Sequence, residues 1–266
     1  MSTNFNVDPY FDDFDPANNY HRILFKPGFA VQARELTQSQ TILQNQISNF
    51  ADNIFKQNTP ITGGQVTTNF NCFYVKLQTT YNNVSVNPTS WVNKSIQDVT
   101  GTVVAKIIAA AATTGINGDP PTIVVTYTSG TQFTDGAVIY DSVTLQPIAQ
   151  AITSSSTGQS SVASVSQGVF YISSNYTNAN GEVISNGIFV QVNPQTIILD
   201  KYDNVPNLRV GLNITESIAT YLNDSSLLDP AIGASNYQAP GADRYMIDLD
   251  LETRPLVLGK IGRAHV

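Results

Sequence analysis

The clearest hydrophobic pattern in the chain lies between residues 32 and 58, a stretch without proline or glycine. Its apolar side chains recur at helical spacing, which predicts an amphipathic helix over 32–58. Within that helix, alternating steps of four and three residues form the seam of a coiled coil. The seam positions are Leu36, Gln40, Leu43, Ile47, Phe50 and Ile54.

Two arrangements of this helix fit the pattern. In the first, copies of the chain associate through the seam, and the polar residue at one a position, Gln40, sets their register. In the second, the helix packs on its own β-rich body, aided by Ile42 and Phe55 beside the seam. The sequence leaves both arrangements open.

Residues 1–31, ahead of the helix, are predicted to form an extended arm. Pro9, Pro16 and Pro27 each remove a backbone donor and disfavour helix in the residue before them. The arm is also rich in aromatic side chains, whose apolar area is expected to lie against its own body or a neighbour. The candidate subunit contacts in the arm are Tyr10, Phe11, Phe14, Tyr20 and Phe25.

After residue 60 the apolar period changes to about two, and glycine, asparagine, proline and aspartate mark the breaks. The chain is therefore predicted to be mainly β with one long N-terminal α-helix: an extended arm, the helix, then β-sandwich or small-barrel modules. The main β-body is expected over 59–98 and 169–260, and a small β module with a Ser-rich loop is expected as an insertion at 99–168. The candidate strands cover 70–78, 102–109, 121–128, 137–141, 145–152, 162–172, 187–192, 196–200, 208–215 and 244–251.

The last six residues, 261–266, do not continue the alternation that precedes them. They read Ile-Gly-Arg-Ala-His-Val, which the string ATC GGA AGA GCA CAC GTC encodes, and this string resembles the start of a common sequencing-library adapter. We expect 261–266 to be an adapter-derived artefact of a metagenomic fragment and the natural protein to continue beyond Lys260. The alternative is a genuine short tail.

Charge is sparse in this sequence. Asp, Glu, Lys and Arg make up 12% of the residues, about half the proportion of an ordinary globular protein. An uncharged polar surface suits β-rich proteins that assemble, because hydroxyls and amides pair between subunits without desolvating ions. The net charge is −7 and no basic run occurs, so nucleic acid is not an expected partner. No run of about 18 apolar residues occurs either, so no membrane span is expected.

Residues suited to catalysis or metal binding are scarce. With His21 and His265 as the only histidines, no catalytic arrangement, cofactor site or zinc site is predicted, and the chain is not expected to be an enzyme. The one dense acidic cluster comprises Asp8, Asp12, Asp13 and Asp15. Its spacing lacks the pattern of a calcium loop, so it is expected to be solvated or to pair with arginine. Cys72, the single cysteine, lies in an apolar run and is expected to be a buried small hydrophobe.

Two parts of the chain carry longer strings that resemble a known family. The first has DPYFDDFD at 8–15, YHRILFKPGFAVQARELTQ at 20–38 and LQNQI at 43–47. The second has GIFVQV at 187–192, LRVGL at 208–212 and NYQAPGADRY at 236–245. Both resemble DUF4815, a family of virion proteins of tailed phages, especially T4-like phages of marine cyanobacteria. The likeness spans most of residues 5–255 and is weakest over 99–168.

The resemblance implies a structural protein of a contractile-tail bacteriophage particle, associated with its baseplate or fibres. The implied partners are other tail and baseplate proteins and further copies of the chain. The implied location is the virion, after synthesis in the host cytoplasm. The family brings no catalytic residues, and its members are longer.

Two other functions stay open on the sequence alone. One is a carbohydrate-binding tail adhesin, in which Trp91 or exposed tyrosines would stack on glycans of the host surface. The other is a polysaccharide-degrading tail enzyme, which would need two carboxylates about 5 to 10 Å apart in a cleft. Nothing in the sequence predicts such a cleft.

Overall fold

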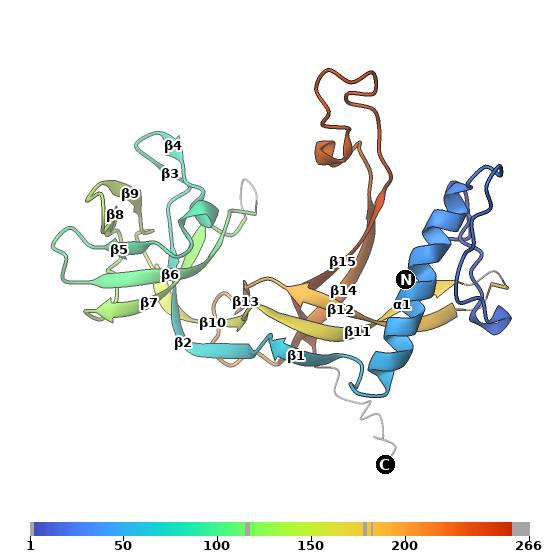
Figure 1. Cartoon of the computed structure of the whole chain (residues 1–266). Coiled ribbons are helices and arrows are strands. Elements are labelled where there is room, and N and C mark those ends of the chain that lie inside the picture. The colour runs from blue at the N-terminus through green and yellow to red at the C-terminus, as the bar shows by residue number, and fades with distance from the viewer. Residues whose placement is uncertain (1–2, 115–117, 178–179, 182, 257–266) are drawn as a thin grey trace, which may run out of the picture. The chain divides into compact units, whose positions relative to one another are not determined.

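The structure, a computed structural model, describes residues 3–114, 118–177, 180–181 and 183–256 (Figure 1). Over these residues the chain is mainly β, with one α-helix near the N-terminus, which confirms the predicted fold class. The chain divides into two compact units. Unit 1 is built from the residues up to Gln65, from Gln167–Asn193 and from Asn213–Asp250. Unit 2 is built from Val66–Ser166, from Pro194–Leu212 and from the residues after Asp250.

The helix α1 runs over Ala33–Asp52. Its first turn is closed by the Glu35 side chain, whose Oε2 accepts a hydrogen bond from the Gln32 backbone N–H at 2.9 Å. A carboxylate in the first turn also interacts favourably with the helix dipole. The helix therefore starts where the sequence predicts it to start.

The helix ends before the predicted end of the range 32–58. After Asp52 the chain turns, and the N–H groups of Ile54 and Phe55 both donate to the carbonyl of Ala51. The turn brings the Phe55 ring edge-on to Phe189, with 5.8 Å between the ring centroids. Tertiary packing of one aromatic ring thus replaces the last helical turn that the local pattern favours.

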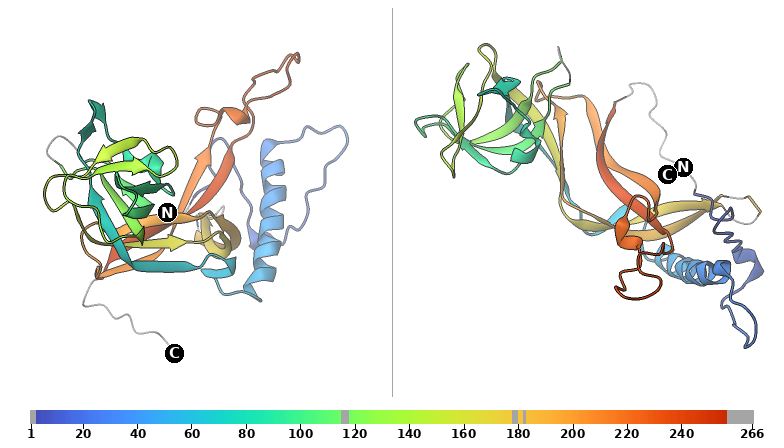
Figure 2. Two further views of the ribbon diagram at one scale, coloured as in Figure 1. Left: turned by 90° about the vertical axis from the view of Figure 1, so that its left-hand side faces the viewer. Right: turned by 90° about the horizontal axis from the view of Figure 1, so that it is seen from above.

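The sheet of unit 1 has three antiparallel strands in the order β1-β11-β12. The strands are β1 (Thr59–Gly63), β11 (Gly168–Thr177) and β12 (Val183–Val192). The helix α1 packs against β12. Both views in Figure 2 show α1 beside the N-terminal arm. The arm holds one 3₁₀ turn, η1 (Pro16–Asn18).

A two-stranded ribbon, β14 (Leu208–Ala219) with β15 (Arg244–Pro255), contributes residues to both units. The loop between its strands contains the 3₁₀ turn η3 (Ser225–Leu227) and is closed at its base by a bridge between Leu228 and Pro240. The part of the ribbon in unit 1 supplies the wall against which the arm lies.

Unit 2 is an antiparallel sheet of eight strands in the order β13-β10-β2-β7-β6-β5-β8-β9. Six of its strands form a barrel. They are β2 (Val66–Lys76), β5 (Ser95–Gln97), β6 (Val104–Ala111), β7 (Thr122–Ser129), β8 (Val138–Asp141) and β9 (Pro147–Gln150). The added strands are β10 (Thr157–Val165) and β13 (Gln195–Asp200). The short elements between β2 and β5 are β3 (Thr80–Tyr81), β4 (Val84–Ser85) and η2 (Pro88–Trp91).

The strands from β2 to β9 in this order close into a barrel, and Figure 2 shows this part of the chain as curled strands in cyan and green. Closure occurs between the ends of β2 and β9, where Leu77 and Ala151 form a bridge. On either side of it, the Gln78 N–H donates to the Gln150 carbonyl at 2.8 Å and the Ile152 N–H donates to the Lys76 carbonyl at 3.0 Å. A closed barrel leaves no free edge between its first and last strands.

Alternating side chains of the strands fill the barrel. The core comprises Val75, Leu77, Val86, Ile96, Ala105, Ile107, Ile123, Val125, Phe133, Ile139, Ala149 and Ala151. Outside the barrel, a smaller cluster around Cys72 and Val162 packs β10 onto β2. Cys72 is fully buried, as the sequence predicts, and burial raises the pKa of its thiol to about 11.

The boundaries of the β modules differ from the predicted ones. The expected insertion at 99–168 shares its barrel with β2 and β5, which precede residue 99. The expected strand 162–172 is two strands, β10 and β11, separated at Ser166 and Gln167. At this break Gly168 lies so close to Gly64 that a Cβ on Gly168 would be 2.1 Å from the Gly64 nitrogen. The predicted artefact at 261–266 lies outside the described residues.

Candidate interaction surface

The helix α1 has two faces of different composition. The face toward the sheet of unit 1 buries small and polar side chains together with one isoleucine. These buried residues are Ile42, Asn45, Ser48 and Ala51. In the heptad of the seam they occupy positions c, f, b and e, whereas the a and d positions point elsewhere.

Hydrogen bonds fix this buried face on the sheet. The Gly187 backbone N–H donates to Oγ of Ser48 at 2.8 Å. The Tyr171 hydroxyl donates to Oδ1 of Asp52 at 2.9 Å and also lies 3.2 Å from the Ser48 carbonyl. Burial, and then the bond to Asp52, raise the pKa of the Tyr171 hydroxyl. The helix is therefore attached to β11 and β12 by polar contacts rather than by its apolar seam.

The predicted seam is exposed to solvent along its whole length. Its apolar members have exposed fractions of 53–69%, and Gln40 is exposed as well. These members are Leu36, Leu43, Ile47, Phe50 and Ile54, the last of which lies beyond the end of α1. Of the residues expected to aid packing on the body, Ile42 is buried and Phe55 contacts Phe189. The body thus takes the opposite side of the helix and leaves the seam uncovered.

The first half of the arm is held against the ribbon in unit 1. The Tyr10 hydroxyl donates to Oδ2 of Asp243 at 2.6 Å. The Phe5 ring meets Tyr245 edge-on, with 4.9 Å between the ring centroids. The bond to Asp243, followed by burial, raises the pKa of Tyr10 to about 12. Tyr10 therefore anchors the arm within its own unit.

The acidic cluster of the arm lies against the start of α1. Oδ2 of Asp12 accepts a hydrogen bond from the Thr41 hydroxyl at 2.5 Å, and Asp13 pairs with Arg34 at 3.2 Å. Asp12 is buried, and burial raises the pKa of its carboxyl, although the bond from Thr41 acts in the opposite direction. The arginine pairing expected for the cluster occurs at Asp13.

The remaining arm residues divide into buried and exposed ones. Phe14 is buried, whereas Phe11, held at a φ of 48°, is half exposed. The exposed large side chains of the second half of the arm are Tyr20, Leu24, Phe25, Phe29 and Val31. Tyr20 and Phe25 thus stay available for contacts with a partner, while Tyr10 and Phe14 serve the fold of unit 1.

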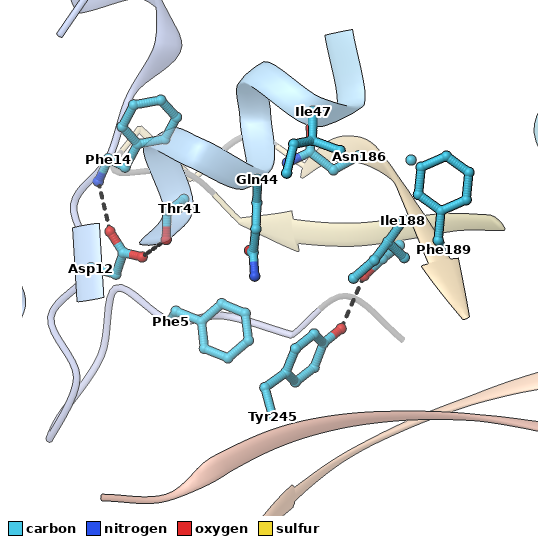
Figure 3. Close-up of a pocket in the computed structure, with 12 residues that line it drawn as sticks. Phe5, Asp12, Phe14, Thr41, Gln44, Ile47, Asn186, Ile188, Phe189 and Tyr245 are labelled. Carbon is cyan, nitrogen blue, oxygen red and sulfur yellow. Dashed lines mark hydrogen bonds between the residues drawn. The ribbon is translucent and has the colours of Figure 1, made fainter. Parts of the chain in front are cut away.

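A cavity of about 270 Å³ lies where the arm, α1 and β12 meet (Figure 3). Figure 3 shows Phe5 and Tyr245 at one end, Ile47 from the helix, and Asp12 bonded to Thr41 at the rim. A wider groove of about 790 Å³ shares Phe5 and Tyr245 with the cavity and extends past Gln40. The cavity is mainly apolar, so it adds to the uncovered apolar surface on this side of unit 1.

Neither a metal centre nor a membrane helix is present in the part of the chain that the structure describes. Over these residues, no three His, Cys, Asp or Glu side chains come together in a way that could hold a metal ion. Likewise, no described helix is long and apolar enough to cross a membrane. His21 is exposed in the arm.

The sequence pattern finds the exposed seam but not the residues that fix the helix. The hydrophobic pattern does not single out these residues, and each bond joins residues that lie far apart in the chain. The bonded pairs are Ser48 with Gly187 and Asp52 with Tyr171. The one available signal is the small size of Ser48 and Gly187, which permits a close approach of helix and strand.

Comparison with protein families gives one match. The model of a domain of unknown function, DUF4815, matches residues 8–180 and 170–255. The chain belongs to the DUF4815 family. The matched parts of this DUF4815 chain include the arm, α1, the barrel and the ribbon, so both faces of the helix belong to the family domain. No curated protein and no solved structure matches the chain.

Proposed function

We propose that this DUF4815 chain is a non-enzymatic structural subunit of a tailed-phage particle, associated with its baseplate or fibres, and that it acts through contacts between subunits. The observation that carries this proposal is the exposed seam of α1. A helix already fixed on its sheet by one face presents a second, apolar face whose large side chains stay more than half exposed among the residues that the structure describes.

The exposed seam differs from ordinary scattered exposure of apolar residues. Single exposed apolar side chains are common on soluble proteins, but contiguous apolar patches mark interaction sites. Here the exposed side chains follow one another along one helix, and the loop with Leu24 and Phe29 adds further apolar area in unit 1. The low charge content supports assembly for the same reason, because it lowers the cost of burying the surface.

The assignment to a phage particle rests on the residue strings at 8–47 and 187–245, which resemble virion proteins of tailed phages. Membership of DUF4815 is consistent with a role in a phage particle, and the family description itself names no function. The glycan-binding alternative has no such support. Trp91, which would stack on a sugar, packs partly buried against the barrel core.

Mass spectrometry of purified particles tests the proposal. Particles of a phage that encodes a full-length homologue are banded on a density gradient and their tails are separated from their heads. We expect the protein in the tail fraction, in a constant ratio to other tail proteins, and antibody label at the tail in electron micrographs. Its presence in the soluble lysate alone would contradict the proposal.

A further inference from the structure

We infer that the seam of α1 binds the same seam of a second copy of the chain, as a parallel pair with Gln40 opposite Gln40. This inference deepens the proposed function and rests on it, because it names a partner for the exposed surface. The other occupants of the seam, a different tail protein or a segment of the arm, are outcomes of the test.

The spacing of the seam favours a helical partner with the same period. Its steps of four and three residues average 3.5, whereas a straight α-helix has 3.6 residues per turn. A 3.5-residue repeat keeps a seam in contact only with another helix of matching repeat. A second copy has this repeat by definition. The opposite face, with Asn45 and Ser48, packs on the sheet without such a repeat.

The absence of charge on the seam favours a second copy over a charged partner. Between Leu36 and Ala51 the helix contains no Asp, Glu, Lys or Arg. Two copies of a chain with a net charge of −7 repel each other at most of their surface, but here they meet without opposing like charges. Arg34, two residues before the first seam position, is already paired with Asp13.

The exposed area is of the size that a weak but specific pair needs. Exposed fractions of 53–69% on five large apolar side chains, four of them in α1 and Ile54 just beyond its end, correspond to at most about 500 Å² per copy, or about 1,000 Å² for the pair, at the lower end of specific interfaces. Association through the seam alone is therefore expected at micromolar concentrations, and contacts elsewhere in a particle would strengthen it.

Gln40 sets the orientation of the pair. A single polar side chain at an a position selects the register in which it meets its own copy, because the two amides then bond to each other. In an antiparallel pair Gln40 would face apolar side chains, and its amide would lose hydrogen bonds on burial. The parallel, in-register pair avoids this cost.

Cysteine crosslinking tests the register. Cys72, the natural cysteine, is fully buried, so an added surface thiol reacts alone. Under mild oxidation we expect the L43C chain, which keeps Gln40 and carries its thiol at the next d position, to form a disulfide-linked dimer rapidly at micromolar concentration. The control is I232C, which places a thiol at a still more exposed position in the loop between β14 and β15. Equal crosslinking of the two variants would overturn the parallel pair.

Sedimentation equilibrium tests the seam itself. The double variant L43K/F50K places charges on two exposed seam positions, and L222K/I232K adds the same charge at exposed apolar positions outside the helix. We expect the seam variant to weaken dimerisation at least about 100-fold, given the transfer free energy of two large apolar side chains, while the control dimerises like the wild type. Because all four residues are exposed, circular dichroism should be unchanged. A wild-type chain that stays monomeric at about 100 μM would overturn the inference.

Failure of this inference and failure of the proposed function give different results. A monomeric wild-type chain whose full-length form still enters phage tails would remove the self-contact and keep the structural role, with another tail protein as the occupant of the seam. A chain that dimerises through the seam but is absent from particles would keep the self-contact and remove the virion role.

Discussion

The hydroxyl of Tyr171 and the carboxylate of Asp52 lie 2.9 Å apart, and through this bond strand β11 holds the last residue of α1. Tyr171 is fully buried, and its ring packs beside Phe55 and Phe189. The orientation of the helix, and with it the exposure of the seam, therefore depends on a polar contact at one end. This dependence can be measured.

Removing the hydroxyl should loosen the helix without disturbing the ring packing. Tyr171→Phe deletes the bonds to Asp52 and to the Ser48 carbonyl, and we expect a loss of about 1–2 kcal/mol in the free energy of unfolding. Urea unfolding followed by the helical signal at 222 nm checks this. The matched control is Tyr221→Phe, at a partly exposed loop position, which should change stability by less than about 0.5 kcal/mol. Equal effects of the two changes would contradict the role of the Tyr171 hydroxyl.

A methyl group at Gly187 should be strongly destabilising. A Cβ there would lie 1.8 Å from the Tyr171 hydroxyl oxygen, so Gly187→Ala must displace the ring or the strand, and we expect a cost of about 3 kcal/mol. Gly211→Ala in β14 is the control, because its Cβ would meet no atom within 4 Å. Chemical denaturation measures both.

A double variant isolates the cause of that cost. In a Tyr171→Ala background the obstructing ring is gone, so the additional effect of Gly187→Ala should fall to a small fraction of its effect in the wild type. An undiminished cost in this background would show that the clash with Tyr171 is not the reason.

The sequence predicts the class of this fold well because most of its strands alternate apolar and polar residues. On β15, for example, Leu249 and Leu251 are buried, whereas Asp250 between them is exposed. The barrel closure was not predictable in this way. It depends on pairing of Leu77 with Ala151, residues 74 positions apart in the chain, and periodicity says nothing about which strands meet.

The candidate surface was predictable as a set of residues but not in its orientation. Apolar spacing groups Leu43 with Phe50 on one side of a helix, and the structure keeps them together. Spacing cannot tell whether that side meets the body, and hydrophobicity alone would suggest that it does. The body instead takes the side of Ser48, because Gly187 permits a close approach and a hydrogen bond that no hydropathy pattern records.

Alkaline titration should release the arm through Tyr10. Its pKa is about 12 in the folded chain against an ordinary value of 10.0, so the unfolded chain loses its proton first. The contribution of Tyr10 to stability is complete below pH 10 and declines as the pH rises from 10 toward 12. Tyr10→Phe should reduce this pH dependence, measured as the difference between the two unfolding curves at each pH. Four other tyrosines also have raised pKa values, and they remain in both proteins, so their effect cancels in this difference. They are Tyr171 and Tyr245 in unit 1 and Tyr127 and Tyr202 in unit 2. Identical slopes would contradict the anchoring role of Tyr10.

Mild acid should strengthen the contact between the arm and the helix through Asp12. Burial raises the pKa of this carboxyl above its ordinary value of 3.8, and the neighbouring Asp13 adds to the rise, against the hydrogen bonds from Thr41 and the Phe14 N–H. The folded chain therefore binds the proton more readily than the unfolded chain. The contribution of Asp12 to stability increases as the pH falls through its raised pKa and becomes constant below 3.8.

Protection of the arm from proteolysis measures this dependence on Asp12. The protease should be one that keeps its activity between pH 4 and 7, and the site of cleavage should be Phe11, which is half exposed. We expect cleavage to slow as the pH falls in the wild type. Asp12→Asn has a similar shape but no titrating carboxyl, so its cleavage rate, corrected for protease activity, should be much less sensitive to pH. Asp8→Asn is the matched control, because it removes an exposed carboxylate of the same arm. Equal pH dependence in the Asp12→Asn variant and the wild type would contradict the role of Asp12.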